Sequence, residues 1–142
     1  MPSEPSTKRK IQPYGSWPSP ISSDMVSAGQ VRLGEMSLSG ETLYWTESRP
    51  KEEGRSVLIR CALNSHPNEL TSSTFNVRSR VHEYGGGSIL AAEDTVYFSN
   101  LSDHRLYRLE SDSTTPLPIS APGNIRYADG TLDTRRRRLI TV

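Results

Sequence analysis

Residues 76–109 read NVRSRVHEYGGGSILAAEDTVYFSNLSDHRLYRL, and this stretch decides the fold. Two segments within it alternate apolar and polar residues, Thr95 to Asn100 and Arg105 to Leu109, with the polar cluster Ser102-Asp103-His104 between them. Alternation with a period of two is typical of β-strands, and a short polar cluster of this kind closes a hairpin. The stretch therefore predicts consecutive antiparallel strands that follow a glycine-rich loop.

The same layout occurs twice more along the chain. Thr42 to Glu47 and Val57 to Cys61 form an upstream copy, and Arg138 to Val142 begins a third. Equivalent residues of the copies are spaced 53 and 43 residues apart, at Leu43, Val96 and Leu139. A period of roughly 40 to 50 residues with several short strands is typical of β-propeller blades. We predict an all-β fold, a partial β-propeller of about two and a half four-stranded blades with an N-terminal extended arm.

Composition divides the chain into segments. Residues 1–12 are polar and aperiodic, which predicts a disordered leader. Residues 13–30 combine prolines with two aromatic residues, which predicts an extended arm packed on another surface and ending in a short helix. Residues 31–142 are the predicted incomplete propeller domain, with blades at about 31–75, 76–122 and a truncated 123–142. A strand that ends at residue 142 would leave an open edge, so we expect this chain to be incomplete.

Two details of the strands are also predicted. Pro116 and Pro118 alternate in the last strand of the second blade, which suits an outer edge because proline cannot donate to an interior ladder. Ile125 to Ala128 is predicted to be the innermost strand of the third blade.

The overall composition excludes several classes of protein. The 142 residues carry a formal net charge of +1, which gives no excess positive charge for a nucleic-acid footprint. No apolar run has the length of a signal peptide or a membrane span. Cys61 is the single cysteine and is predicted to be a buried free thiol, which favours a reducing compartment. We therefore predict a cytoplasmic location, with no nucleic-acid and no membrane partner.

Four motifs together resemble the propeller of prolyl oligopeptidase family serine peptidases, within the branch of dipeptidyl-peptidase or acylaminoacyl-peptidase-like enzymes. They are PYGSWPSPIS at 13–22, NVRSRVHEYGGG at 76–87, VYFSN at 96–100 and RLYRL at 105–109. The resemblance implies a two-domain enzyme in which the propeller restricts access of peptide substrates to an α/β-hydrolase domain with a Ser, Asp and His triad. That C-terminal domain is absent from this sequence.

The residues that a hydrolase domain would need are not found here. A serine nucleophile on a strand-to-helix turn needs glycine on both sides, and no Gly-x-Ser-x-Gly element occurs in the chain. His66 and His104 lie in predicted turns without cysteine or carboxylate at ligand spacing, so we predict no metal site and no cofactor. The chain alone is therefore predicted to be inactive, with no catalytic residue of its own.

The triple glycine and the residues before it allow two interpretations. In the structural one, Gly85, Gly86 and Gly87 permit positive φ and close approach where the chain enters an inner strand. In the functional one, His82, Glu83 and Tyr84 face the central channel or the catalytic domain, and Glu83 pairs with a peptide amine or a basic side chain. The function predicted is an N-terminal propeller fragment that gates peptide access to the missing domain. The alternative is a noncatalytic, propeller-like protein-interaction module.

Overall fold

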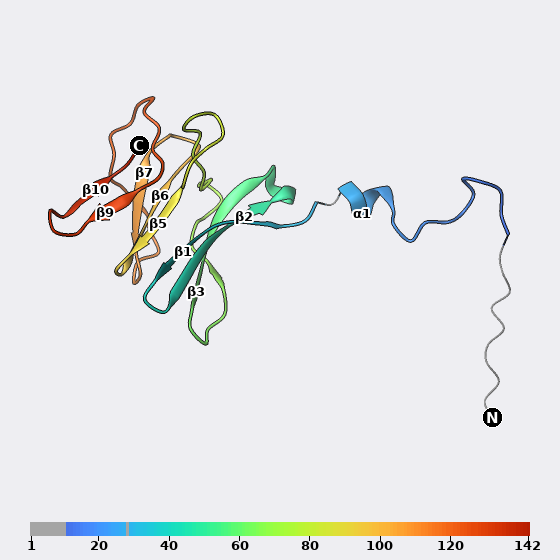
Figure 1. Cartoon of the computed structure of the whole chain (residues 1–142), viewed down its shortest axis with the longest axis horizontal. Coiled ribbons are helices and arrows are strands. Elements are labelled where there is room, and N and C mark those ends of the chain that lie inside the picture. Colours follow the sequence, from blue (N-terminus) through green and yellow to red (C-terminus); the bar gives the residue numbers. More distant parts are fainter. Residues whose placement is uncertain (1–10, 28) are drawn as a thin grey trace.

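The computed structural model describes residues 11–27 and 29–142. Within them the chain forms three antiparallel sheets and very little helix (Figure 1). This confirms the all-β class predicted from the alternating segments. Most of the predicted leader, residues 1–10, lies outside the described residues.

The first sheet has four strands in the order β1-β2-β3-β4, all antiparallel. Its elements are β1 (Arg32–Ser39), β2 (Thr42–Arg49), the short 3-10 helix η1 (Pro50–Glu52), β3 (Arg55–Ala62) and β4 (Asn68–Glu69). Two predicted strands lie within β2 and β3, both of which extend beyond the predicted ends.

The second sheet repeats this order as β5-β6-β7-β8. Its strands are β5 (Ile89–Ala92), β6 (Thr95–Ser99), β7 (Leu106–Glu110) and β8 (Leu117–Pro118). The strand β8 pairs with β7 only, so Pro118 lies on an edge strand as predicted. The predicted hairpin is confirmed, with β7 displaced by one residue from the expected range.

The third sheet is a hairpin of β9 (Thr131–Asp133) and β10 (Arg138–Ile140). The prediction that Ile125 to Ala128 forms its inner strand is wrong, since β9 begins at Thr131, three residues after the end of that segment. Ala128 exchanges two backbone hydrogen bonds with Val142, at 3.1 and 3.0 Å, but Asp129 then adopts a left-handed conformation with φ of 52°. A left-handed residue interrupts the extended ladder, so the strand starts only after Gly130.

The hydrophobic core lies between the first two sheets. It contains Tyr44 and Leu58 from the first sheet and Phe98 and Tyr107 from the second, with Phe75 packed against them. The ring of Phe75 meets the rings of Phe98 and Tyr107 edge-on, with centroids 5.7 and 5.1 Å apart, which is a favoured aromatic geometry. The alternation seen in the sequence thus places one face of each sheet in a shared core.

The first strands of the first two sheets, β1 and β5, lie side by side. Ser37 in β1 accepts a hydrogen bond on Oγ from the backbone N–H of Ala91 in β5, at 2.9 Å. Ser39 Oγ donates to the carbonyl of Glu93 at 2.7 Å. The polar side chains of β1 thus point toward the second sheet. Because side chains alternate along a strand, the apolar Met36 and Leu38 lie on the opposite face of β1, where they are exposed.

Two predictions on single segments remain. The arm and the helix α1 (Ser23–Ser27) project away from the sheets and Tyr14 and Trp17 are exposed, so the packing of the arm on another surface stays a prediction (Figure 1). Cys61 is half-buried rather than buried, because it is the last residue but one of β3, where the burial of the strand ends. No helix among the described residues is long and apolar enough to cross a membrane.

Candidate functional site

The candidate site is the loop that connects the first two sheets and contains the predicted residues. Its incoming arm alternates, since Val77, Ser79 and Val81 are buried while Arg78 and Arg80 are exposed. Val77 forms an isolated bridge with Asn100, and Ser79 Oγ donates to the carbonyl of Tyr127 at 2.7 Å. The loop is therefore anchored to the second sheet and to the segment that follows it.

The tip of the loop is a strained turn. His82 and Glu83 both have positive φ, 54° and 64°, which is costly for residues with a side chain, by about 1 to 3 kcal/mol each. The N–H of Gly85 donates to the carbonyl of Val81 at 3.0 Å and closes the turn. His82, Glu83 and Tyr84 are exposed, and Tyr84 retains 96% of its accessible surface. Strain of this kind clusters at active sites, ligand clamps and switch regions.

Each of the three glycines meets a different constraint. Gly85 has φ of 91°, a conformation that favours glycine. A Cβ on Gly86 would lie 2.7 Å from both the Cβ of Ala128 and Oδ2 of Asp129. A Cβ on Gly87 would lie 3.0 Å from Oδ1 of Asp129, which already accepts the Gly87 N–H at 2.7 Å. Positive φ thus applies to one glycine and close backbone approach to the next two.

The outgoing arm of the loop is fixed by a carboxylate that sequence reasoning missed. Glu35 in β1 accepts hydrogen bonds from the backbone N–H of Ser88 and of Ile89 and from the Ser88 hydroxyl. Ser88 is itself buried. The exposed turn is therefore held at both ends by buried hydroxyls while its tip is free to contact another molecule. Glu35 could not be identified as the partner of Ser88 from local sequence patterns, because the two residues are 53 positions apart.

A second turn beside the loop contains Asp103, whose carboxyl group has a lowered pKa. Burial would raise the pKa of the Asp103 carboxyl, but hydrogen bonds from the Tyr107 hydroxyl, the Arg105 N–H and the Asn100 amide hold that pKa below its ordinary value. The same burial and the Asp103 contact raise the pKa of Tyr107. Asp103 accepts three hydrogen bonds, so its role is to hold the turn from Asn100 to Arg105 in place.

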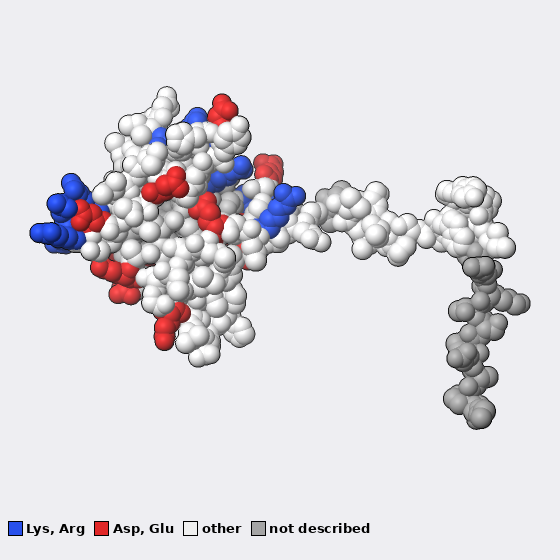
Figure 2. Space-filling view, viewed as in Figure 1, with Lys and Arg blue, Asp and Glu red and all other residues white. Residues whose placement is uncertain are grey.

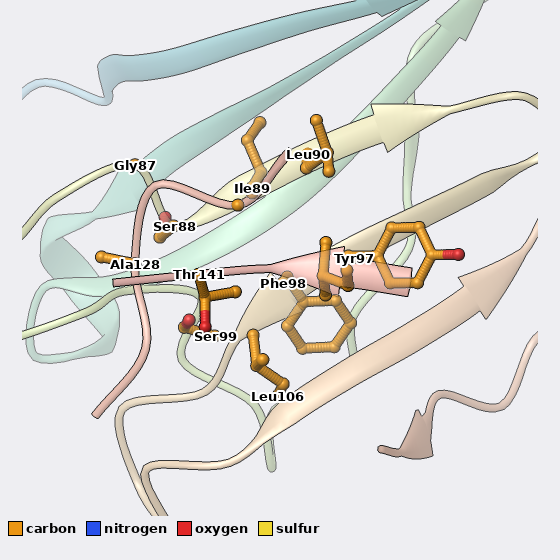
Figure 3. A pocket seen from close by; sticks show the side chains of 12 residues that line it. Gly87, Ser88, Ile89, Leu90, Tyr97, Phe98, Ser99, Leu106, Ala128 and Thr141 are labelled. Carbon is orange, nitrogen blue, oxygen red and sulfur yellow. The ribbon is translucent and has the colours of Figure 1, made fainter. Parts of the chain in front are cut away.

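The seam between the second and third sheets is packed rather than open. Ile89, Leu90 and Phe98 line one side of it, and Ala128 and Thr141 line the other (Figure 3). The space between them is about 10 Å³, close to the minimum for one water molecule. Among residues 11–27 and 29–142, moreover, no three His, Cys, Asp or Glu side chains gather as metal ligands. The seam between the second and third sheets therefore has no room for a ligand.

Comparison with known proteins gives matches among solved structures alone. No protein-family model and no curated protein matches the chain. A puromycin-hydrolyzing peptidase of Mycobacterium tuberculosis is similar, with 37% sequence identity, a TM-score of 0.79 and coverage of 94% of this chain and 23% of that chain. A puromycin hydrolase is similar with 29% identity, a TM-score of 0.77 and coverage of 92% and 22%.

These matches extend over almost all of the present sequence, arm and sheets together. The chain spans less than a quarter of the length of either solved relative. The structural neighbours and the four sequence motifs point to the same group of enzymes. The chain therefore belongs to the prolyl oligopeptidase family of peptidases and corresponds to one part of its members.

Proposed function

We propose that the three sheets are successive blades of a β-propeller. Two observations support this: the first two sheets share the antiparallel order of four consecutive strands, and the inner strand β1 lies beside the inner strand β5. Radial repetition of this kind is how propellers build a channel lined by inner strands. The blades then occupy about 31–75, 76–122 and 123 onward, with 13–30 as the arm.

The propeller gates the access of peptides to a serine-peptidase domain that lies outside this sequence. The observation that carries this function is the 37% identity and 0.79 TM-score over 94% of the chain to a puromycin-hydrolyzing peptidase. Puromycin is for that reason the first substrate to test. The motif resemblance favours the dipeptidyl-peptidase or acylaminoacyl-peptidase branch, and the single cysteine favours the cytoplasm.

The exposed turn of His82, Glu83 and Tyr84 faces the substrate passage in this proposal. Its strained backbone and its outward side chains support the assignment, because the turn is held at both ends and presents Glu83 to solvent. A carboxylate in such a position pairs with a peptide amine through a charge-assisted hydrogen bond.

The gate is tested with a chimera in which this chain replaces the matched part of the M. tuberculosis peptidase. We expect the chimera to hydrolyse puromycin and short peptides and to leave a folded protein intact, while the 142-residue chain alone hydrolyses none of them. Correct folding is verified by circular dichroism and by a cooperative melting transition. A folded chimera without hydrolase activity, or one that digests folded protein as readily as peptides, contradicts the proposed gate.

The role of the turn is tested in the same chimera with Glu83→Gln. The expected result is a rise in KM of about tenfold for peptides with a free α-amine, with kcat unchanged, as for loss of one charge-assisted contact. The matched control is Glu41→Gln, an exposed glutamate in the β1–β2 turn. Equal KM values for Glu83→Gln and the parent chimera would show that Glu83 does not contribute to substrate binding.

A further inference from the structure

One short segment, residues 126–129, contacts the chain on both sides of the strained turn. It connects the second sheet to the third. On the incoming side of the turn, the carbonyl of Tyr127 accepts hydrogen bonds from the buried hydroxyls of Ser79 and Ser99, both at 2.7 Å. The chain that enters the turn is therefore tied to this segment and, through it, to the second sheet.

A second contact on the incoming side reaches the turn itself. Arg126 Nη1 donates to the carbonyl of Arg80 at 3.3 Å, and the same carbonyl accepts the N–H of Glu83 at 3.3 Å. The segment thus meets the turn at the carbonyl that orients the backbone of Glu83.

On the outgoing side, Asp129 holds Gly87 by two hydrogen bonds. Its Oδ1 accepts the N–H of Gly87 at 2.7 Å, and its own N–H donates to the carbonyl of Gly87 at 2.8 Å. Asp129 makes both contacts from a left-handed conformation, with φ of 52°, which aspartate and asparagine adopt more readily than most residues with a side chain. A single residue therefore fixes the end of the turn through its side chain and its backbone.

The carboxylate of Asp129 is not shared with the basic residues of the third sheet. Those residues gather at the tip of the β9–β10 hairpin (Figure 2), where Asp133 pairs with Arg136 and Arg138. Asp129 precedes the other end of β9 and belongs to none of the seven ion pairs among the described residues. Its hydrogen bond with Gly87 thus accounts for its charge-bearing side chain.

We propose that Asp129 is a positioning residue for peptide binding. By holding Gly87 it fixes the turn, so that Glu83 lies where the α-amine of a peptide reaches it. The inference rests on the proposed function, since it takes Glu83 as the contact for that amine. The strength of a charge-assisted hydrogen bond depends on its geometry, so a turn that shifts weakens the contact although Glu83 is still present.

Three variants separate the side chain of Asp129 from its backbone conformation. Asp129→Gly removes the acceptor and keeps a residue that tolerates positive φ. Asp129→Asn keeps an acceptor oxygen for the Gly87 N–H and also tolerates positive φ. The matched control is Glu93→Gly, which makes the same kind of change at an exposed residue with φ of 54° in the β5–β6 turn.

The first measurement is amide hydrogen exchange by NMR in the 142-residue chain. The N–H groups of Glu83 and Gly85 are bonded within the turn. In Asp129→Gly we expect both to exchange about tenfold faster, while the amides of residues 57–59 in β3 keep their rates, because the turn opens locally. Asp129→Asn and Glu93→Gly should exchange like the parent chain. A general loss of stability would instead speed exchange in all sheets.

The second measurement is a double-mutant cycle in the chimera with the M. tuberculosis peptidase. For peptides with a free α-amine, we expect Asp129→Gly to raise KM about fivefold with kcat unchanged. If Asp129 acts through Glu83, adding Asp129→Gly to Glu83→Gln changes KM by less than about twofold. Asp129→Asn should restore the KM of the parent. A merely structural role would lower the amount of active enzyme, and hence kcat, and would leave KM unaltered.

Unchanged exchange at Glu83 and Gly85 in Asp129→Gly would overturn the inference. It would be overturned equally if Asp129→Asn behaved like Asp129→Gly, or if the effects of Asp129→Gly and Glu83→Gln on KM multiplied. The outcome is separable from that of the proposed function. A rise in KM for Glu83→Gln, with neither exchange nor KM altered by Asp129→Gly, contradicts this inference alone. A turn loosened by Asp129→Gly, with KM unaffected by Glu83→Gln, contradicts the proposed amine contact and leaves Asp129 as the residue that positions the turn.

Discussion

At the scale of single residues, Gly86 shows how closely the loop approaches the next segment. A Cβ there would lie 2.7 Å from the side chains of Ala128 and Asp129, well inside van der Waals contact. We expect Gly86→Ala to destabilise the chain by about 1 to 3 kcal/mol, the usual cost of overpacking. The measurement is urea unfolding followed by circular dichroism.

The control for that substitution is Gly123→Ala. A Cβ at Gly123 meets nothing within 4 Å and its φ is not positive, so this change should leave stability unaltered within about 0.5 kcal/mol. Equal midpoints for the two variants would mean that Ala128 and Asp129 shift without cost, and that Gly86 is not required for close packing.

Asp103 makes the stability of its turn depend on pH. Its folded-state pKa lies below the ordinary value of 3.8, so the stabilisation is complete above that value and is lost as pH falls through the lowered pKa. We expect Asp103→Asn to cost about 1 kcal/mol near pH 7, since the amide has one acceptor oxygen in place of two and cannot accept all three hydrogen bonds that the carboxylate accepts.

The pH series of that variant distinguishes a charge effect from a packing effect. The difference in unfolding free energy between the parent chain and Asp103→Asn should shrink as pH is lowered below about 4. Asp112→Asn, an exposed aspartate in the β7–β8 connection, serves as control. A difference that stays constant between pH 7 and pH 2.5 would exclude the carboxylate charge as its cause.

At the scale of secondary-structure elements, Glu35 joins β1 to the start of β5. Glu35→Ala would leave the buried N–H of Ser88 and the neighbouring N–H of Ile89 without their acceptor. Each unsatisfied donor costs about 1 to 3 kcal/mol, so the loss should exceed that of Ser37→Ala, which removes one acceptor from Ala91. Amide hydrogen exchange at 88–91 should rise in Glu35→Ala, and unchanged exchange there would contradict the coupling.

The strands were predictable from sequence because alternation and turn residues are local signals. The strands of residues 42–62 and 95–110 needed only period-two patterns and short polar clusters. The start of β9 was not predictable, because it depends on the left-handed conformation of Asp129, whose N–H donates to Gly87. The partners of Ser88 and Arg80 were not predictable either, because Glu35 and Arg126 are 53 and 46 residues away in sequence and local patterns carry no signal for such contacts.

At the scale of the whole molecule, the apolar side chains of β1 remain exposed on one face of the first sheet, although Val57 and Ile59 of β3 on the same face are buried. The register pairs Leu38 with Leu43 and Met36 with Trp45 on this face, and Leu38 and Met36 are 68% and 72% exposed. A contiguous apolar surface on a sheet face drives association. Within the proposed propeller, a further sheet of the longer peptidase would cover this face as the second sheet covers the other.

These exposed apolar side chains predict how the isolated chain behaves. We expect the 142-residue chain to self-associate as its concentration rises, and Met36→Lys with Leu38→Lys to keep it monomeric in sedimentation velocity experiments. The control is Leu117→Lys with Ile119→Lys, which places two lysines at partly exposed residues, 48% and 42%, beside the edge of the second sheet. In the chimera, where the face is expected to be buried, the same lysines should be harmful. Met36→Lys with Leu38→Lys should lower the melting temperature of the chimera more than Leu117→Lys with Ile119→Lys does. A chimera that tolerates both pairs equally would mean that no sheet of the peptidase packs on β1 and β2, and the propeller arrangement proposed for this chain would fail with it.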